Sequence, residues 1–385
     1  MKKININKVM VVAVILVVTS MSSAVEETWT RKADMPTARF SLSTSVVDGK
    51  IYAIGGGQSP YGSYLSTVEE YDPSTDMWTT KADMPTRRSG HAASVVNDKI
   101  YVIGGEPSEQ ASLATVEEYN STTDTWTQKA DMPTRRTFLC TCVVNGEIYA
   151  FGGITAGGPG GNSFPTTLEV YDPVTDTWAR KADMPISRNA ATACAVNGKI
   201  YVIGGVVGNL EGAALSTVYE YDPLADTWTR KSNMPTARIW SSSIALAGKI
   251  YVIGGVKFGG PVFSTVEEYD PITDTWITKL DMPTRRGMLS TSVVNGNIYA
   301  IGGSRIWWPW TGTSTVEEYD LNPLVVDFNC DGIVDAADVC LMLDYWLTDE
   351  PFYDIAPRPF GDGIVDVQDL ILLAEYLFEE IPPVD

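Results

Sequence analysis

Six arginines follow Met-Pro pairs at similar intervals and are the first candidates for binding chemistry. A guanidinium group binds a carboxylate through two parallel hydrogen bonds, so a ring of arginines would suit an acidic peptide or an acidic glycan. A second interpretation stays open, in which each arginine pairs with backbone or with a strand glutamate as a structural element of the repeat. The arginines are Arg39, Arg88, Arg136, Arg188, Arg238 and Arg286.

Tryptophans are the second group of candidates. Trp307, Trp308 and Trp310 lie in one short segment, and Trp240 lies two residues after an arginine of the first group. Indole rings stack on sugars and dominate many protein interfaces. We therefore predict an aromatic and basic face that binds a protein or carbohydrate ligand. The alternative interpretation is that the Trp segment folds back over the point where the repeats described below close into a ring, or packs on the C-terminal tail described below.

Acidic residues near the C-terminus show the spacing of a calcium loop. Between residues 327 and 338, oxygen-bearing side chains stand at positions 1, 3, 5, 9 and 12, and glycine stands at position 6. This is the EF-hand-type spacing, in which position 7 contributes a backbone carbonyl. A second copy has Arg358 and Phe360 at positions 1 and 3, so we expect a weaker or irregular site there. The predicted Ca²⁺ ligands are Asp327, Asn329, Asp331, Ile333, Asp335 and Asp338, with Asp362, Ile364, Asp366 and Asp369 in the second loop.

An internal repeat supplies the elements that must position the arginines. A phrase similar to KIYVIGG occurs six times, and each time a tyrosine follows it. The distance from each Trp to the next second glycine is always 27 residues, whereas the distance from that glycine to the following Tyr varies from 14 to 18. Four short strands per repeat predict a propeller blade, with an Asn-Gly or Asp-Gly turn between the first two strands. The one variable connection lies on the same face as the arginines, which is the usual layout of a binding surface.

The diglycine, the spaced Tyr and Trp, and the Arg after Met-Pro resemble the kelch family. The resemblance implies an all-β six-bladed propeller over residues 25–321, in which arginines at this place contact acidic ligands in several members. The sixth repeat stops at Tyr319-Asp320 without a Trp strand, and an unattached Trp strand at residues 27–32 precedes the first repeat. We predict that this N-terminal strand closes the ring as the outer strand of the sixth blade, which removes exposed sheet edges.

The tail, residues 327–385, follows a linker at 322–326 and resembles a type I dockerin, because each of its paired calcium loops precedes one apolar helix. The resemblance implies a small α-helical, Ca²⁺-dependent module that binds a cohesin-type partner. Positions 10 and 11 of the loops are Ala336-Ala337 and Val367-Gln368, where cellulosomal dockerins often have Ser-Thr. The alternative is a calcium-stabilised module that docks on its own propeller or at the cell surface.

Charge and the first residues restrict the remaining possibilities. A net charge of −20 excludes a protein that coats nucleic acid or anionic lipid by long-range attraction. Lys2, Lys3 and Lys8, an apolar run over 9–18 and the small residues at 22–24 predict a signal peptide over 1–24. We therefore expect secretion, with no integral membrane segment after removal of the signal.

The expected function is that of a secreted binding protein, in which the propeller recognises a ligand and the tail attaches the protein to a partner. The alternative is a secreted carbohydrate-active enzyme, such as a sugar epimerase or mutarotase, because six-bladed kelch propellers include sialic acid epimerases. His91 is the only histidine, which argues against metal sites built from paired imidazoles. Cys140, Cys142 and Cys194 are expected in the core.

Overall fold

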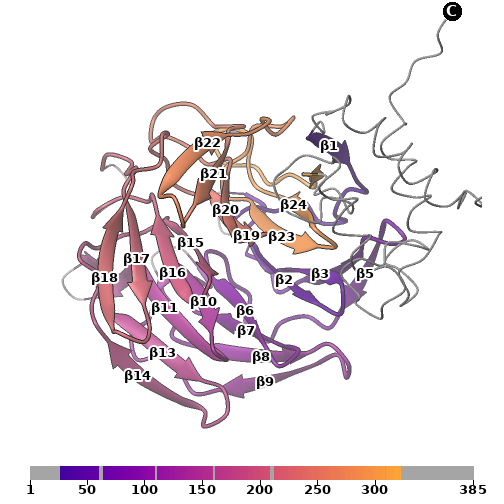
Figure 1. Ribbon diagram of the computed structural model, residues 1–385. Coiled ribbons are helices and arrows are strands. Elements are labelled where there is room, and N and C mark those ends of the chain that lie inside the picture. Colours follow the sequence, from indigo (N-terminus) through magenta and orange to yellow (C-terminus); the bar gives the residue numbers. More distant parts are fainter. Residues whose placement is uncertain are drawn as a thin grey trace, which may run out of the picture. The chain divides into compact units, whose positions relative to one another are not determined.

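The computed structural model describes residues 27–59, 64–108, 111–158, 161–208, 212–307 and 309–321. The regular elements in these ranges are β-strands, which form six antiparallel sheets arranged as the blades of a propeller (Figure 1). Within these ranges we find no helix with the length and apolarity needed to cross a membrane. The predicted signal segment, linker and calcium loops lie outside the described residues.

Each blade is a meander of four strands, and the chain runs from the ring centre outwards through strands A, B, C and D. Blade 1 contains β2 (Ser43–Val47), β3 (Lys50–Ile54), β4 (Val68–Asp72) and β5 (Met77–Lys81), and blade 2 contains β6 (Ala92–Val96), β7 (Lys99–Ile103), β8 (Val116–Asn120) and β9 (Thr125–Lys129). Blade 3 contains β10 (Thr137–Val144), β11 (Glu147–Gly158), β13 (Leu168–Asp172) and β14 (Thr177–Lys181), with β12 (Gly161–Ser163) beside β11. Blade 4 contains β15 (Thr192–Val196), β16 (Lys199–Ile203), β17 (Val218–Asp222) and β18 (Thr227–Lys231), and blade 5 contains β19 (Ser242–Leu246), β20 (Lys249–Ile253), β21 (Val266–Asp270) and β22 (Thr275–Thr278).

Blade 6 combines residues from both ends of the described chain. Its sheet order is β23 (Ser290–Val294), β24 (Asn297–Ile301), β25 (Val316–Asp320) and then β1 (Thr28–Arg31). The Trp29 ring stacks on Tyr319 at a centroid distance of 4.6 Å, and its Nε1–H donates to Leu280 O at 3.2 Å. Because β1 is joined to β25 only through non-covalent contacts, the stability of this blade depends on these contacts and on the ladder between the two strands.

The hairpin turns and the buried strands follow from the repeat sequence. Asp48 and Gly49 both have positive φ, as a two-residue type I′ turn between β2 and β3 requires. Each B strand is the second strand of its sheet, and its side chains pack against neighbouring blades, so that Ile51 in β3 is completely buried. Cys140, Cys142 and Cys194 are buried and free, as predicted, and burial raises the pKa of the Cys140 thiol to about 12.

An aspartate in each C–D turn holds neighbouring blades together, and we call this set of contacts the inter-blade latch. Asp226 Oδ1 accepts hydrogen bonds from Tyr221 OH at 2.6 Å and from Ala182 N–H at 2.8 Å. Trp228 Nε1–H donates to Ala182 O at 2.9 Å. The hydrogen bonds from Tyr221 and Ala182 hold the pKa of Asp226 below its usual value. The same contacts recur at Asp76, Asp124, Asp176 and Asp274.

Candidate functional site

The six repeated arginines lie inside the blades, with exposed fractions of 0–2%. In blade 5, Arg238 Nη1 donates to Gly254 O at 3.1 Å and to Thr265 O at 3.0 Å. Its Nη2 donates to Glu267 Oε2 at 2.6 Å. The prediction that these arginines form a cradle for an acidic ligand is therefore corrected, because their Nη groups are bound to the protein's own oxygens. The second interpretation, a structural element of the repeat, describes what the structure contains.

Five blades share the same buried cluster of Arg, Glu and Thr. Arg286 pairs with Glu317 at 2.7 Å, and Glu317 also accepts a hydrogen bond from Thr284 Oγ1. Burial lowers the pKa of Arg286 to about 10, and the charge of Glu317 opposes this effect. The arginine therefore remains a cation at neutral pH. The equivalent pairs are Arg39–Glu69, Arg88–Glu117, Arg136–Glu169 and Arg238–Glu267.

Blade 4 departs from this pattern at two positions at once. Tyr219 replaces the glutamate, and Ile186 replaces the threonine that would donate to it. The Arg188 guanidinium lies 5.1 Å from the centroid of the Tyr219 ring and donates to Thr217 O and Thr217 Oγ1. Burial lowers the pKa of Arg188 to about 10. A cation–π contact thus stands where the other blades have a buried ion pair.

The diglycine of each repeat lets neighbouring blades approach closely beside these arginines. Gly104 has a φ of +65°, and a Cβ added there would lie 2.6 Å from Arg136 O of the next blade. Gly105 N–H donates to the same carbonyl at 2.8 Å. A side chain at position 104 would therefore push apart two blades.

Two residues after each arginine, the backbone forms a closed ring that we call the collar. The N–H of each collar residue donates to the carbonyl of the equivalent residue in the preceding blade, at N–O distances of 2.7 to 3.4 Å. All of them have positive φ, between 49° and 60°, although only one is glycine. Because every blade shares this strained conformation, the ring itself requires it. The collar residues are Ser41, Gly90, Phe138, Ala190, Trp240 and Met288.

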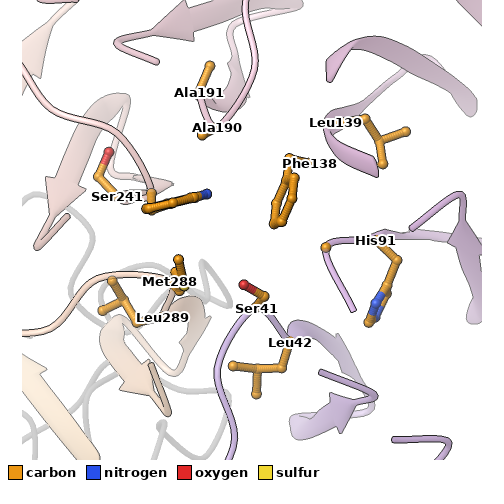
Figure 2. A pocket seen from close by; sticks show the side chains of 12 residues that line it. Ser41, Leu42, His91, Phe138, Leu139, Ala190, Ala191, Ser241, Met288 and Leu289 are labelled. Atoms are coloured by element: carbon orange, nitrogen blue, oxygen red, sulfur yellow. The ribbon is translucent and has the colours of Figure 1, made fainter. Parts of the chain in front are cut away.

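The collar residues and the residues that follow them line a cavity of about 130 Å³ at the ring centre (Figure 2). Figure 2 shows the Phe138 ring projecting towards the middle of this opening. His91 is the one titratable side chain among the described lining residues, and burial lowers its pKa to about 3. The imidazole is therefore neutral at physiological pH.

An aromatic cluster beside the cavity joins blade 5 to the variable loop of blade 6. The Trp240 ring lies 5.7 Å from Trp307 and 5.1 Å from Trp310, between ring centroids. Phe258 stacks edge-on against Trp307 at 4.8 Å and keeps 39% of its surface exposed. Trp240 is buried, whereas Trp307 and Trp310 are partly exposed. The Trp segment thus folds back on the ring, as in the alternative interpretation, while leaving aromatic edges at the surface.

An open depression with two exposed arginines lies on the same face. Arg285 and Arg305 are exposed, and together with Ile306 they line an open depression of about 500 Å³. Unlike the repeated arginines, which are buried, Arg285 and Arg305 present their charge to solvent. Trp308 and the predicted calcium ligands lie outside the described residues. Within the described ranges, no group of three or more His, Cys, Asp or Glu side chains is placed to hold a metal ion.

Sequence reasoning missed the collar as a site, although a signal was available. Marker positions of the repeat, such as the Ile-Tyr pair, the diglycine and the Met-Pro pair, are the same in every blade, but the collar position holds Ser, Gly, Phe, Ala, Trp and Met in turn. Variation at one position of a regular repeat indicates that the position does not serve the common architecture through its side chain. This signal would have pointed to the ring centre.

Comparisons with known proteins agree with this architecture. The family model described as the KLHDC2/KLHL20/DRC7 Kelch-repeats domain matches residues 41–255, and a Kelch motif model matches residues 241–282. The solved structure titled "Structure of YjhT" resembles this chain with a TM-score of 0.63 at 16% identity, over 74% of this chain and 96% of that chain. At this identity the likeness shows the fold alone. No curated protein matches the chain. Because the first family model spans more than half of its residues, this protein belongs to the kelch-repeat family.

Proposed function

We propose that this protein is a binding protein whose propeller recognises a protein partner through the aromatic cluster of blades 5 and 6. The observation that carries the proposal is the set of partly exposed rings, Trp307, Trp310 and Phe258, which lie in the variable B–C connections. Large rings at the centre of a face, backed by a buried ring such as Trp240, are typical of interface hot spots. Membership of the kelch-repeat family also favours protein binding.

The proposal also covers the segments outside the described residues. Residues 1–24 would direct secretion, and residues 327–385 would attach the protein to a cohesin-type or cell-surface partner in the presence of Ca²⁺. The support is the loop spacing, which places five oxygen-bearing side chains around one glycine turn between residues 327 and 338. Without Ca²⁺ these carboxylates repel one another, so attachment should require the metal.

Affinity capture followed by quantitative binding tests the role of the aromatic cluster. The mature full chain would be the bait for the secreted fraction of the source organism, and a captured protein would be purified and titrated against variants. We expect Trp307→Ala with Trp310→Ala to weaken binding at least about 30-fold, since hot-spot side chains contribute about 2 kcal/mol or more. Leu224→Ala is the control, because Leu224 is 89% exposed in a C–D turn on the opposite face. Equal losses in both variants would reject the aromatic cluster as the interface.

A second arm separates the tail from the propeller. The full chain carrying Asp327→Ala and Asp331→Ala keeps every described residue of the propeller. We expect this variant to behave in calcium as the unaltered chain behaves with chelator, losing the tail partner but keeping the propeller partner. Retention of all partners by the variant and in chelator would reject calcium-dependent attachment.

A further inference from the structure

We propose that the collar cavity is a binding site for a neutral group that has an apolar body and one hydrogen-bond acceptor, for which the Trp240 indole N–H is the donor. The acceptor would be a carbonyl or amide oxygen, carried by a small molecule or by a neutral side chain of a partner. The cavity shares Trp240 with the aromatic cluster. The two proposals are tested at different groups, the Trp240 N–H for the cavity and the Trp307 and Trp310 rings for the cluster.

The state of the Trp240 indole is the main observation. Trp240 lines the cavity and is 6% exposed, and its buried Nε1–H meets no acceptor among the described residues. The indoles of the outer strands behave differently, since each donates to a backbone carbonyl at 2.9 to 3.2 Å; they are Trp29, Trp78, Trp126, Trp178, Trp228 and Trp276. A buried N–H without an acceptor is costly, so an oxygen is expected to bind Trp240 from within the cavity.

The charge of the lining determines the charge of the ligand. The nearest arginines, such as Arg238, direct their Nη groups into the blades and are bound there. His91 is neutral because burial lowers its pKa to about 3. A carboxylate in the cavity would therefore lose water without gaining a cation, which is unfavourable. This distinguishes the cavity from the exposed depression at Arg285 and Arg305.

The size and walls of the cavity determine the rest of the ligand. Its volume of about 130 Å³ approaches the roughly 150 Å³ of an engineered apolar cavity that binds benzene. Phe138, Leu139 and Met288 supply apolar surface, and the Ser41 and Ser241 hydroxyls add two short polar groups. The collar N–H and carbonyl groups are bonded to one another, so recognition falls to side chains. One ring or one amide side chain fits this description.

Three probes of the same shape test each part of the proposal. The ¹⁵N-labelled full chain would be titrated with benzamide, benzoate and toluene, and the Trp240 indole resonance would be identified by its loss in Trp240→Phe. We expect benzamide to shift this resonance saturably, with benzoate and toluene binding at least 10-fold more weakly. Trp240→Phe should weaken benzamide binding by a similar factor, as measured by calorimetry. Near-ultraviolet circular dichroism would check that the variant is folded.

Several results would overturn the proposal. Benzoate binding as tightly as benzamide would contradict the neutral ligand, and toluene binding as tightly would contradict the donor role of Trp240. An ordered water on Trp240 Nε1 that benzamide fails to displace in a crystal structure would show a solvent site only.

Competition between benzamide and a captured protein partner would identify the ligand as a partner's side chain. Binding of benzamide without such competition would identify it as a free small molecule.

Discussion

Blade 4 and the other five blades hold the same buried arginine in two different ways. In blade 5, Arg238 faces the carboxylate of Glu267, whose other oxygen accepts from Thr236 Oγ1 at 2.6 Å. In blade 4, Arg188 faces the Tyr219 ring, and Ile186 stands where the other blades have the threonine whose hydroxyl donates to the glutamate. Both arginines keep their hydrogen bonds to the first glycine of the diglycine and to the backbone carbonyl of a threonine. The difference teaches that the contact with the glycine carbonyl, which recurs in all six blades, is the common requirement, whereas the counter-ion is exchangeable together with its threonine.

Removal of the carboxylate alone should produce the largest effect. Glu267→Ala leaves Arg238 buried without its counter-ion, and we expect the free energy of unfolding to fall by about 3–5 kcal/mol. Urea denaturation followed by tryptophan fluorescence measures the change. Asp183→Ala is the control, because Asp183 pairs with Arg180 at an exposed site and should contribute less than about 1 kcal/mol. Similar losses in both variants would show that the buried pair has no special role.

Conversion of blade 5 into the blade 4 arrangement should recover part of that loss. The double variant Thr236→Ile with Glu267→Tyr replaces the ion pair by a ring and removes the donor that the carboxylate satisfied. We expect it to be about 2 kcal/mol more stable than Glu267→Ala, which is the value of a desolvated cation–π contact. A double-mutant cycle with both single variants measures the coupling. A double variant less stable than Glu267→Ala would mean that blade 4 depends on further differences.

Blade 2 offers a comparison in pH dependence at the ring centre. His91 has a folded-state pKa of about 3 and an ordinary value of 6.5, so protons bind more readily to the unfolded chain. Its contribution to stability is complete above pH 6.5 and is lost as the pH falls towards 3, by about 1.4 kcal/mol per pH unit. His91→Leu introduces the residue of the equivalent positions 42, 139 and 289. We expect the unfolding free energy of the His91→Leu variant to change little between pH 7 and 5. If the variant and the unaltered chain had the same slope of unfolding free energy against pH, the pH dependence would belong to other groups.

The smallest effect is expected at the collar of blade 4. Ala190 has a φ of 52°, which a side chain disfavours, so Ala190→Gly should stabilise the fold by up to about 1 kcal/mol. Thermal unfolding measures the change. Ala195→Gly in β15 is the control, because its backbone is an ordinary strand and the substitution should destabilise it. Destabilisation in both variants would show that the collar conformation carries no strain.

The sequence was sufficient to predict the blades because their signals are local. Asn-Gly turns and fixed spacings between Trp and diglycine depend only on neighbouring residues, and the propeller has its strands where these signals place them. A Trp strand was expected at residues 27–32, and β1 at Thr28–Arg31 lies beside β25. The calcium ligands and the secretion signal stay predictions, because they lie outside the described residues.

The site was predicted less well because its determinants are carbonyls and backbone angles. Two of the oxygens that hold Arg238 are the backbone carbonyls of Gly254 and Thr265, and the sequence does not show which carbonyls are available as acceptors. A guanidinium that recurs in every blade therefore looked like a binding group, although recurrence equally suits a structural one. The collar was missed for a related reason, since its bonds use only backbone atoms. Trp240 was selected for its ring, whereas the structure draws attention to its buried N–H.

The closed collar also has a consequence for how this propeller could acquire new specificity. Its backbone bonds form a hoop that is the same whether the residue is Gly90 or Trp240. The backbone bonds of the collar and the side chains that it presents are therefore separate features. A substitution at a collar position changes the lining of the cavity without changing the bonds that close the ring. Selection can then vary the six side chains at the axis, with those in contact, such as Phe138 and Trp240, changing together. Each blade thus contributes one side chain to the lining of the cavity that can change while the bonds of the collar stay the same.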